Sequence, residues 1–233
     1  MRVRKGLALS ILWADLPAGS HAGFEAWAAG EPIGPLGEAS GVLGVGRYLA
    51  VSGAPAFIEV YELEHEEAAD DEAALRLQDA TLQALARAGA LAYRPGAGAA
   101  AATPGLHFDR GVYGQIFPPG FDERDAVHGP PPALQIGRIG IPPEHEEEFN
   151  EWYNTEYLVG YLKVPGVYSA RRYLRRSGAG LPYLTVYELA NDQVSRQPDW
   201  DRVRAQSIWR RRIERLWTHA PGSPGIYRRI AAR

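Results

Sequence analysis

An internal repeat is the feature that most constrains how this 233-residue chain can fold. Short groups of residues in the first half recur in the same order 125 residues later: Phe24/Trp27 as Phe149/Trp152, Gly41/Val42 as Gly166/Val167, and Arg47/Tyr48 as Arg172/Tyr173. PAFIEVYEL (55–63) corresponds to LPYLTVYEL (181–189) at an offset of 126, and GVYGQI (111–116) resembles GIYRRI (225–230). Ordered matches at a nearly constant offset predict a tandem duplication.

Hydrophobic periodicity predicts the order strand, helix, strand, strand, helix, strand in each half. The expected strands are 6–14, 42–51, 56–64 and 111–117, then 133–141, 167–175, 183–190 and 225–231; the expected helices are 20–29 and 71–88, then 143–162 and 198–217. This order is the ferredoxin-like βαββαβ motif, whose sheet carries helices on one face only. Two such sheets can cover each other, so we expect an α+β fold in which two ferredoxin-like repeats form a pseudo-dimeric α/β barrel.

The repeat also predicts the domain boundaries. Residues 1–118 form the first repeat, 119–132 a linker rich in proline, and 133–233 the second repeat. The run GAGAAAATP (96–104) indicates a flexible insertion before the last strand of the first repeat. We expect the functional pocket in the second repeat, because its first helix carries more side chains that could take part in chemistry.

Composition excludes several classes of function. The net charge of −3 provides no basic field for nucleic acid or for an anionic membrane surface. The absence of cysteine excludes thiol nucleophiles and disulfides, and it suits a cytoplasmic protein. No apolar run approaches the roughly 20 residues that span a bilayer, and the short run 7–13 reads as a first strand and not as a signal peptide. The expected partner is a small-molecule substrate, and homodimerisation is compatible with the pattern.

The helix at 143–162 carries more chemically useful side chains than its counterpart in the first half. Trp152 and Glu156 are four residues apart, as are Tyr153 and Tyr157, so each pair is expected to share a helix face. In the first half Glu31 aligns with Glu156, whereas the two tyrosines have no counterpart there. This asymmetry favours the second half as the functional one.

We therefore predict that Glu156 is the proton-transfer group and that Tyr157 or Tyr153 donates to a substrate oxygen. The predicted substrate-binding residues are Trp152, Asn154, Arg171 and Tyr183. An alternative interpretation is a core helix whose aromatic side chains pack on the sheet, with Glu156 paired to Arg171 or Arg172. Arg47 and Glu62 recur as Arg172 and Glu188, and this recurrence favours a structural role for the latter two.

The pattern FxxWYxxEY…VPGVxxARRY…YLTVYEL resembles the dimeric α/β-barrel superfamily, near the EthD-like proteins and the small antibiotic-biosynthesis-type monooxygenases. Relatives often have a histidine after the helix glutamate, where this chain has Tyr157. The resemblance implies enzymes of several kinds, among them cofactor-free oxygenases, isomerases, dehydratases, lyases and haem-handling enzymes. A fold of this breadth does not name a reaction.

The six histidines (21, 65, 107, 128, 145 and 219) show no close metal-ligand spacing, so we expect no metal site. The favoured function is an enzyme that acts on a small apolar or aromatic metabolite by acid–base chemistry without a cofactor. One alternative is a haem-dependent or haem-handling enzyme of the same fold, with one of the histidines as axial ligand. The other is a non-catalytic protein that binds a small ligand or serves as a scaffold.

Overall fold

A computed structural model describes residues 5–16, 21–30, 33, 39–87, 108–118, 129–207 and 209–233. The expected insertion at 96–104 and most of the expected linker at 119–132 lie outside these residues. No helix in the described ranges is long and apolar enough to cross a membrane.

The elements follow the predicted order. The first half contains β1 (Ala8–Ala14), α1 (His21–Gly30), β2 (Val42–Ser52), β3 (Phe57–Leu63), the 3-10 helix η2 (Glu66–Asp70), α2 (Glu72–Arg87) and β4 (Phe108–Phe117). The second contains β5 (Ala133–Gly140), η4 (Pro143–His145), α3 (Glu146–Trp152), η5 (Tyr153–Tyr157), α4 (Leu158–Tyr161), β6 (Val167–Ser177), β7 (Tyr183–Leu189), η6 (Val194–Arg196), α5 (Pro198–Gln206), α6 (Arg210–Ile213), β8 (Thr218–His219) and β9 (Gly225–Ala232).

The helix predicted at 198–217 is wrong in its second part. It ends at Gln206, and only the short α6 and the two-residue strand β8 follow before β9. Consequently Trp200, Trp209 and Trp217 do not share one helix face: Trp200 is buried, whereas Trp209 is exposed. Trp217 instead lies directly before β8, the short strand that contains His219 and pairs with β5.

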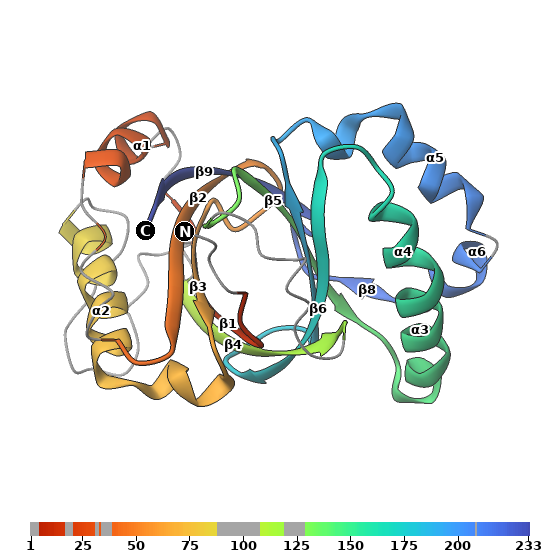
Figure 1. The fold of residues 1–233 in the computed structure, drawn as a ribbon, viewed down its shortest axis with the longest axis horizontal. Coiled ribbons are helices and arrows are strands. Elements are labelled where there is room, and N and C mark those ends of the chain that lie inside the picture. Colours follow the sequence, from red (N-terminus) through yellow and green to blue (C-terminus); the bar gives the residue numbers. More distant parts are fainter. Residues whose placement is uncertain are drawn as a thin grey trace.

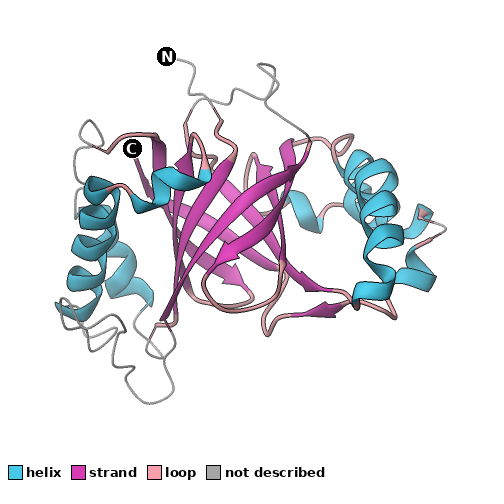
Figure 2. Ribbon diagram, turned by 90° about the horizontal axis from the view of Figure 1, so that it is seen from below, coloured by secondary structure: helices cyan, strands magenta, loops and turns pink. Residues whose placement is uncertain are grey.

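Eight strands close into an antiparallel barrel. Their order is β7-β6-β4-β1-β3-β2-β9-β5, and a further β5–β7 pairing completes the ring, while β8 adds to β5. The α+β class with a closed barrel is therefore confirmed. The helices α1 and α2 cover one side of the barrel and α3–α6 the opposite side (Figures 1 and 2). Within each half the strands follow the same spatial order, β4-β1-β3-β2 and β9-β5-β7-β6.

Side chains fill the barrel interior. Three tyrosine rings each lie over the glycine two residues earlier in the same strand, and a Cβ on that glycine would meet the ring at 2.5 to 2.6 Å: Gly46 under Tyr48, Gly111 under Tyr113, and Gly225 under Tyr227. These tyrosines pack with Leu9, Ile11 and other apolar side chains in one buried cluster. The interior is thus a packed core rather than a channel.

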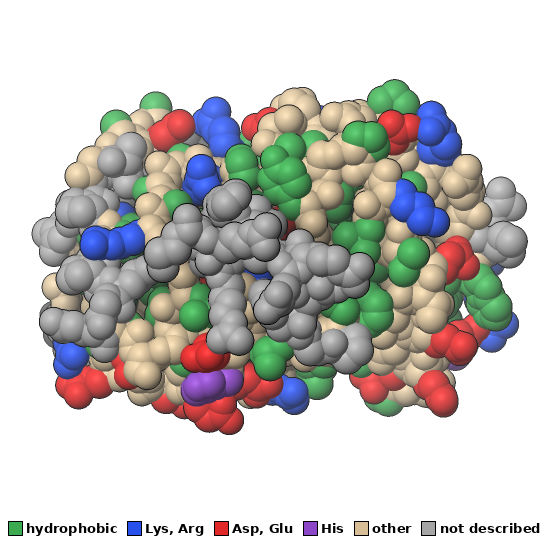
Figure 3. Space-filling model, viewed as in Figure 1, with side chains coloured by type: hydrophobic (Ala, Val, Ile, Leu, Met, Phe, Trp, Pro, Cys, Tyr) green, Lys and Arg blue, Asp and Glu red, His purple; other side chains and the backbone are tan. Residues whose placement is uncertain are grey.

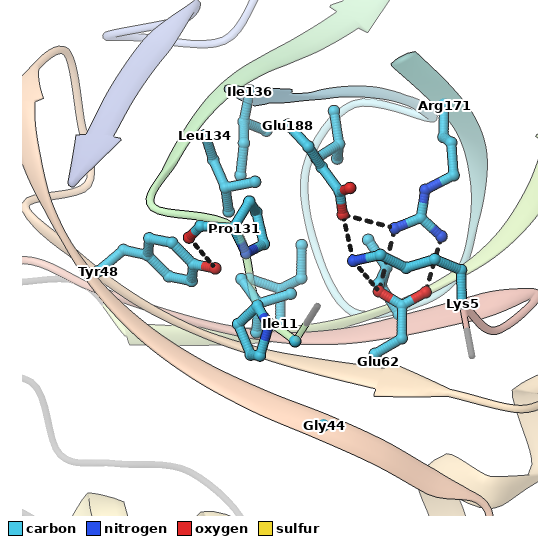
Figure 4. Close-up of a pocket in the computed structure, with 15 residues that line it drawn as sticks. Lys5, Ile11, Gly44, Tyr48, Glu62, Pro131, Leu134, Ile136, Arg171 and Glu188 are labelled. Atoms are coloured by element: carbon cyan, nitrogen blue, oxygen red, sulfur yellow. Dashed lines mark hydrogen bonds and ion pairs between the residues drawn. The ribbon is translucent and has the colours of Figure 1, made fainter. Parts of the chain in front are cut away.

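A buried group of four charges closes one end of this core and joins the two halves (Figure 4). The Lys5 ammonium lies 2.5 Å from Glu188, and the Arg171 guanidinium donates to both oxygens of Glu62 at 2.7 and 3.0 Å. Each pair takes one member from each half. The adjoining cavity of about 30 Å³ has room for only one or two water molecules. We conclude that Arg171 serves the barrel core.

The outer surface carries charges of both signs. In the face drawn in Figure 3, basic side chains of the described residues are scattered singly among neutral and hydrophobic ones. Within the described ranges, no group of three or more His, Asp or Glu side chains is arranged to hold a metal ion.

Candidate functional site

A π-helical turn interrupts the first helix of the second half. Residues 146–152 and 158–161 are α-helical, whereas Tyr153–Tyr157 form η5, in which the Leu158 N–H donates to the Tyr153 carbonyl five residues back. Such turns are rare and often occur at functional sites. All three predicted catalytic residues, together with Asn154, belong to this one turn. The 3.6-residue periodicity used on the sequence gave no sign of it.

An aromatic layer fills most of the space between η5 and the sheet. The Tyr157 ring lies 4.7 Å from Trp152 and 4.8 Å from Tyr153, and the Tyr161 ring lies 4.2 Å from Trp200, all between centroids. A cavity of about 130 Å³ remains among these rings. It is lined by Tyr153, Tyr157, Tyr161, Tyr187, Trp200, Arg204, Glu214, Trp217, His219 and residues of β5. We call it the inner cavity.

His219 places an imidazole at the rim of the inner cavity. The pairing of β8 with β5 fixes its backbone opposite Ile139, and its ring packs edge-on against Trp217 with centroids 5.3 Å apart. Its Nδ1 lies 3.4 Å from the Ser223 hydroxyl. Burial lowers the pKa of His219, Glu214 opposes this effect, and Arg204 adds to it. The side chain is nevertheless partly exposed to solvent, and the lowered pKa favours the uncharged imidazole, which is the form that can act as a ligand.

Arg172 is a fully buried cation on the helix side of β6. Its two terminal nitrogens donate to Asn154 Oδ1 and Asn150 Oδ1, both at 2.7 Å, and its guanidinium carbon lies 4.5 Å from the Tyr153 ring centroid. In the described part of the chain it forms no ion pair, and burial lowers its pKa. A cation held only by neutral groups is an unusual arrangement in a protein core.

A further polar atom of Arg172 lacks a partner. Its Nε is buried and forms no hydrogen bond among the described residues. The Thr185 and Tyr187 hydroxyls on the same face of the sheet lie beside the Tyr153 hydroxyl, and both lower the pKa of Tyr153 against the effect of burial. Buried donors are nearly always satisfied, so the exception at Arg172 adds to the unusual environment of this cation.

A larger cleft opens on the outer side of η5. It has a volume of about 610 Å³ and lies between η5–α4 and α5. Its walls include Glu156, Val159, Gly160, Lys163, Asp199, Arg202, Val203 and Ser207. Tyr157 lines both this outer cleft and the inner cavity, so its ring separates them.

The structure brings most of the predicted site residues together, but not all. Trp152, Tyr153 and Tyr157 pack as one ring cluster, and Asn154 holds Arg172. The Tyr183 hydroxyl accepts from the Asn150 amide, and its ring lies under the Arg172 guanidinium.

The other two predicted residues lie apart from this group. Glu156 faces the outer cleft, and Arg171 lies on the opposite face of β6, inside the barrel. Sequence reasoning underrated Arg172 and did not single out His219. The first half has Glu59 where the second half has Thr185, and this difference in the sequence could have indicated that Arg172 lacks a counter-charge.

No protein-family model matches the chain, and no curated relative does. Solved structures match its fold over almost the full length. A candidate monooxygenase from Lactobacillus acidophilus has a TM-score of 0.54 at 9% identity, with 97% of this chain and 94% of that chain covered. A haem-binding protein from Thermus thermophilus has a TM-score of 0.54 at 9% identity, covering 97% and 91%. A chlorite dismutase mutant from Candidatus Nitrospira defluvii has a TM-score of 0.54 at 14% identity, covering 97% and 91%.

These likenesses support the fold, a closed antiparallel barrel of the α+β class. They also correct one expectation. The prediction of a protein without a cofactor is wrong, because a haem-binding protein and a chlorite dismutase share this fold over nearly the whole chain and point to haem. The physical reason for the error is that the sequence offered no closely spaced histidines, and a single axial ligand needs no such spacing.

Proposed function

We propose that this protein is a haem-binding redox enzyme of the oxygenase type, and that haem binds on the helix side of the second-half sheet. The observation that carries the proposal is His219, a neutral imidazole at the rim of an aromatic cavity. Haem supplies one-electron and O₂ chemistry when it is bound. The names of the matched structures support the same class.

The donor groups around the inner cavity fit haem. A histidine is the commonest protein ligand to haem iron, and the aromatic walls suit a flat apolar ring. Arg204 lines the cavity and is a cation that a haem carboxylate could meet. Arg172 does not line the cavity, but it adds a buried positive charge behind the Tyr153 ring. The volume of about 130 Å³ is below the roughly 300–1,000 Å³ of small-molecule sites. Haem binding therefore requires the aromatic side chains around the inner cavity to move apart.

We also propose roles for the residues of the π-helical turn. Glu156 is the proton-transfer group, because one of its oxygens is buried and has no partner among the described residues. Tyr157 and Tyr153 are hydrogen-bond donors to a substrate oxygen; burial raises the pKa of Tyr153, which keeps its phenol protonated. Trp152 forms the apolar wall, and Asn154 and Tyr183 orient Arg172. Arg171 has no part in this proposal, because Glu62 and Glu188 hold its terminal nitrogens.

We also propose that the chain consists of two ferredoxin-like repeats, 1–118 and 133–233. The equal strand order of the two halves supports it. So does the register, since Arg47 lies opposite Glu59 in the first half as Arg172 lies opposite Thr185 in the second. The cytoplasmic location and the homodimer remain predictions from the sequence.

A haem titration tests the proposed function. Haemin is added to the purified protein, and the Soret band is followed to saturation. We expect one haem per chain, and we expect His219→Ala to shift the band and to weaken binding about tenfold or more. His65→Ala, which changes an exposed histidine on the far half, is the matched control. A titration without saturation, or a His219→Ala variant that behaves like the wild type, would overturn the proposal.

A further inference from the structure

The outer cleft has the size and the walls of a small-molecule site. Its volume of about 610 Å³ lies within the range of such sites. One wall is formed by η5 and α4, the other by α5, and Val159 and Val203 contribute apolar surface. Gly160 allows the two helices to approach, because a Cβ at that position would lie 2.7 Å from a Val203 methyl group.

Glu156 lines this cleft, and one of its two carboxylate oxygens lies beneath the cleft surface without a partner. Glu156 Oε1 is buried from water and forms no hydrogen bond among the described residues. A buried acceptor without a donor costs free energy, more so on a carboxylate. The π-helical turn, which adds one residue to this helical turn, is the local feature that carries Glu156. A ligand in the cleft that draws the carboxylate towards itself would remove the cost.

The charges that line the cleft indicate the sign of that ligand. Asp199 is paired with Arg202 at 2.5 Å, so this pair contributes no net charge. Lys163 is exposed and its charge is screened by water. Glu156 is thus the cleft carboxylate that is partly buried and has no ion-pair partner in the described ranges.

We propose that the outer cleft binds a small organic ammonium ion with an apolar, preferably aromatic, body, and that Glu156 receives the ammonium group. The inference rests on the proposed function in one respect, since it names the class of organic substrate for that enzyme. Tyr157 connects the two sites: its ring lines the cleft on one side and the inner cavity on the other. A ligand in the cleft would therefore lie directly beside the haem position.

Calorimetric titration of the haem-free protein tests this inference independently of haem. The probe is 2-phenylethylammonium, and 2-phenylethanol is its uncharged counterpart of similar shape. We expect saturable binding of the ammonium probe, weakened about tenfold or more by Glu156→Gln, because a charge-assisted hydrogen bond is lost. The alcohol should bind weakly and equally to both proteins. Glu151→Gln, which changes an exposed carboxylate of the same helix, is the matched control.

The outcomes separate the two proposals. Equal binding of the ammonium probe to wild type and Glu156→Gln, or equal binding of the ammonium and the alcohol, would overturn the ammonium site. Failure of the Soret titration would overturn the haem proposal while leaving the calorimetric result to stand. If both hold, adding the ammonium probe to the haem-loaded protein should perturb the Soret band, and Glu156→Gln should abolish that perturbation at the same probe concentration.

Discussion

Arg47 and Arg172 occupy corresponding positions in the two halves, and both are buried. Arg47 lies opposite Glu59, and its Nε donates to Glu59 Oε2 at 2.7 Å. The Thr81 hydroxyl donates to the same oxygen at 2.9 Å, and the Tyr61 hydroxyl donates to the other one. Arg172 lies opposite Thr185, and in the described part of the chain amide oxygens and ring faces surround its guanidinium.

One exchange between the repeats accounts for this difference. The first half keeps a carboxylate at position 59 and closes a complete network beneath α2, as a buried charge requires. The second half has Thr185 at the corresponding position and also has the cation. Its Tyr187 hydroxyl, the counterpart of Tyr61, lies beside the Tyr153 hydroxyl and not beside a carboxylate. The first half thus neutralises its buried arginine, whereas the second half leaves the Arg172 charge without a carboxylate among the described residues.

The largest effect should come from breaking the complete network. Glu59→Gln leaves Arg47 buried without its counter-charge, and we expect the free energy of unfolding to fall by about 3–5 kcal/mol. Urea denaturation followed by circular dichroism measures the change. The control is Glu72→Gln, which removes an exposed helical pair with Arg76 and should cost about 0.3–0.5 kcal/mol. A Glu59→Gln variant as stable as the Glu72→Gln variant would show that the two arginines do not differ in this way.

The next effect tests the second half by making it resemble the first. Thr185→Glu supplies Arg172 with the carboxylate that Arg47 already has, and we expect haem affinity to fall about tenfold or more, because the charge is neutralised within the protein. Thr185→Gln has nearly the same volume and no charge, so it separates electrostatics from space. Soret titrations of the two variants are compared. Equal losses in both would attribute the effect to volume and would contradict a role for the Arg172 charge.

The sequence was informative where a repeat supplied two copies of the same pattern. The spacing of PAFIEVYEL and LPYLTVYEL placed the strands to within a few residues, and the barrel followed from two one-sided sheets. The alternation along β6 also showed that Arg171 and Arg172 face opposite ways. It could not show which one faces the helices, because both faces of this strand are buried.

The parts that were missed depend on contacts between distant residues. The π-helical turn has no residue signature and depends on how α3 and α4 pack on the sheet. His219 reaches the inner cavity only through the pairing of β8 with β5, which replaced the expected end of a long helix. The importance of Thr185 can be recognised only from the strand register, which places it opposite Arg172. Local periodicity reports none of these relations.

The smallest effect concerns the protonation of His219. It tests whether the second half keeps an uncharged imidazole, able to act as a ligand, at its inner cavity. Burial holds the folded-state pKa of His219 below the ordinary value of about 6.5. Below about pH 6.5 the imidazole becomes protonated in the unfolded chain but stays neutral in the folded chain. The free energy of unfolding therefore declines as the pH falls from about 6.5 towards the lowered pKa, and this group does not change it at higher pH.

NMR titration of the imidazole signals, assigned with His219→Gln, measures this pKa directly. We expect the His219 signal to titrate below 6.5. We also expect haem binding to persist at pH 6, where an imidazole of ordinary pKa would be largely protonated and unable to act as a ligand. A His219 signal that titrates at or above 6.5 would remove the electrostatic reason for choosing this histidine as the axial ligand, and the distinction between the halves would then rest on Arg172 alone.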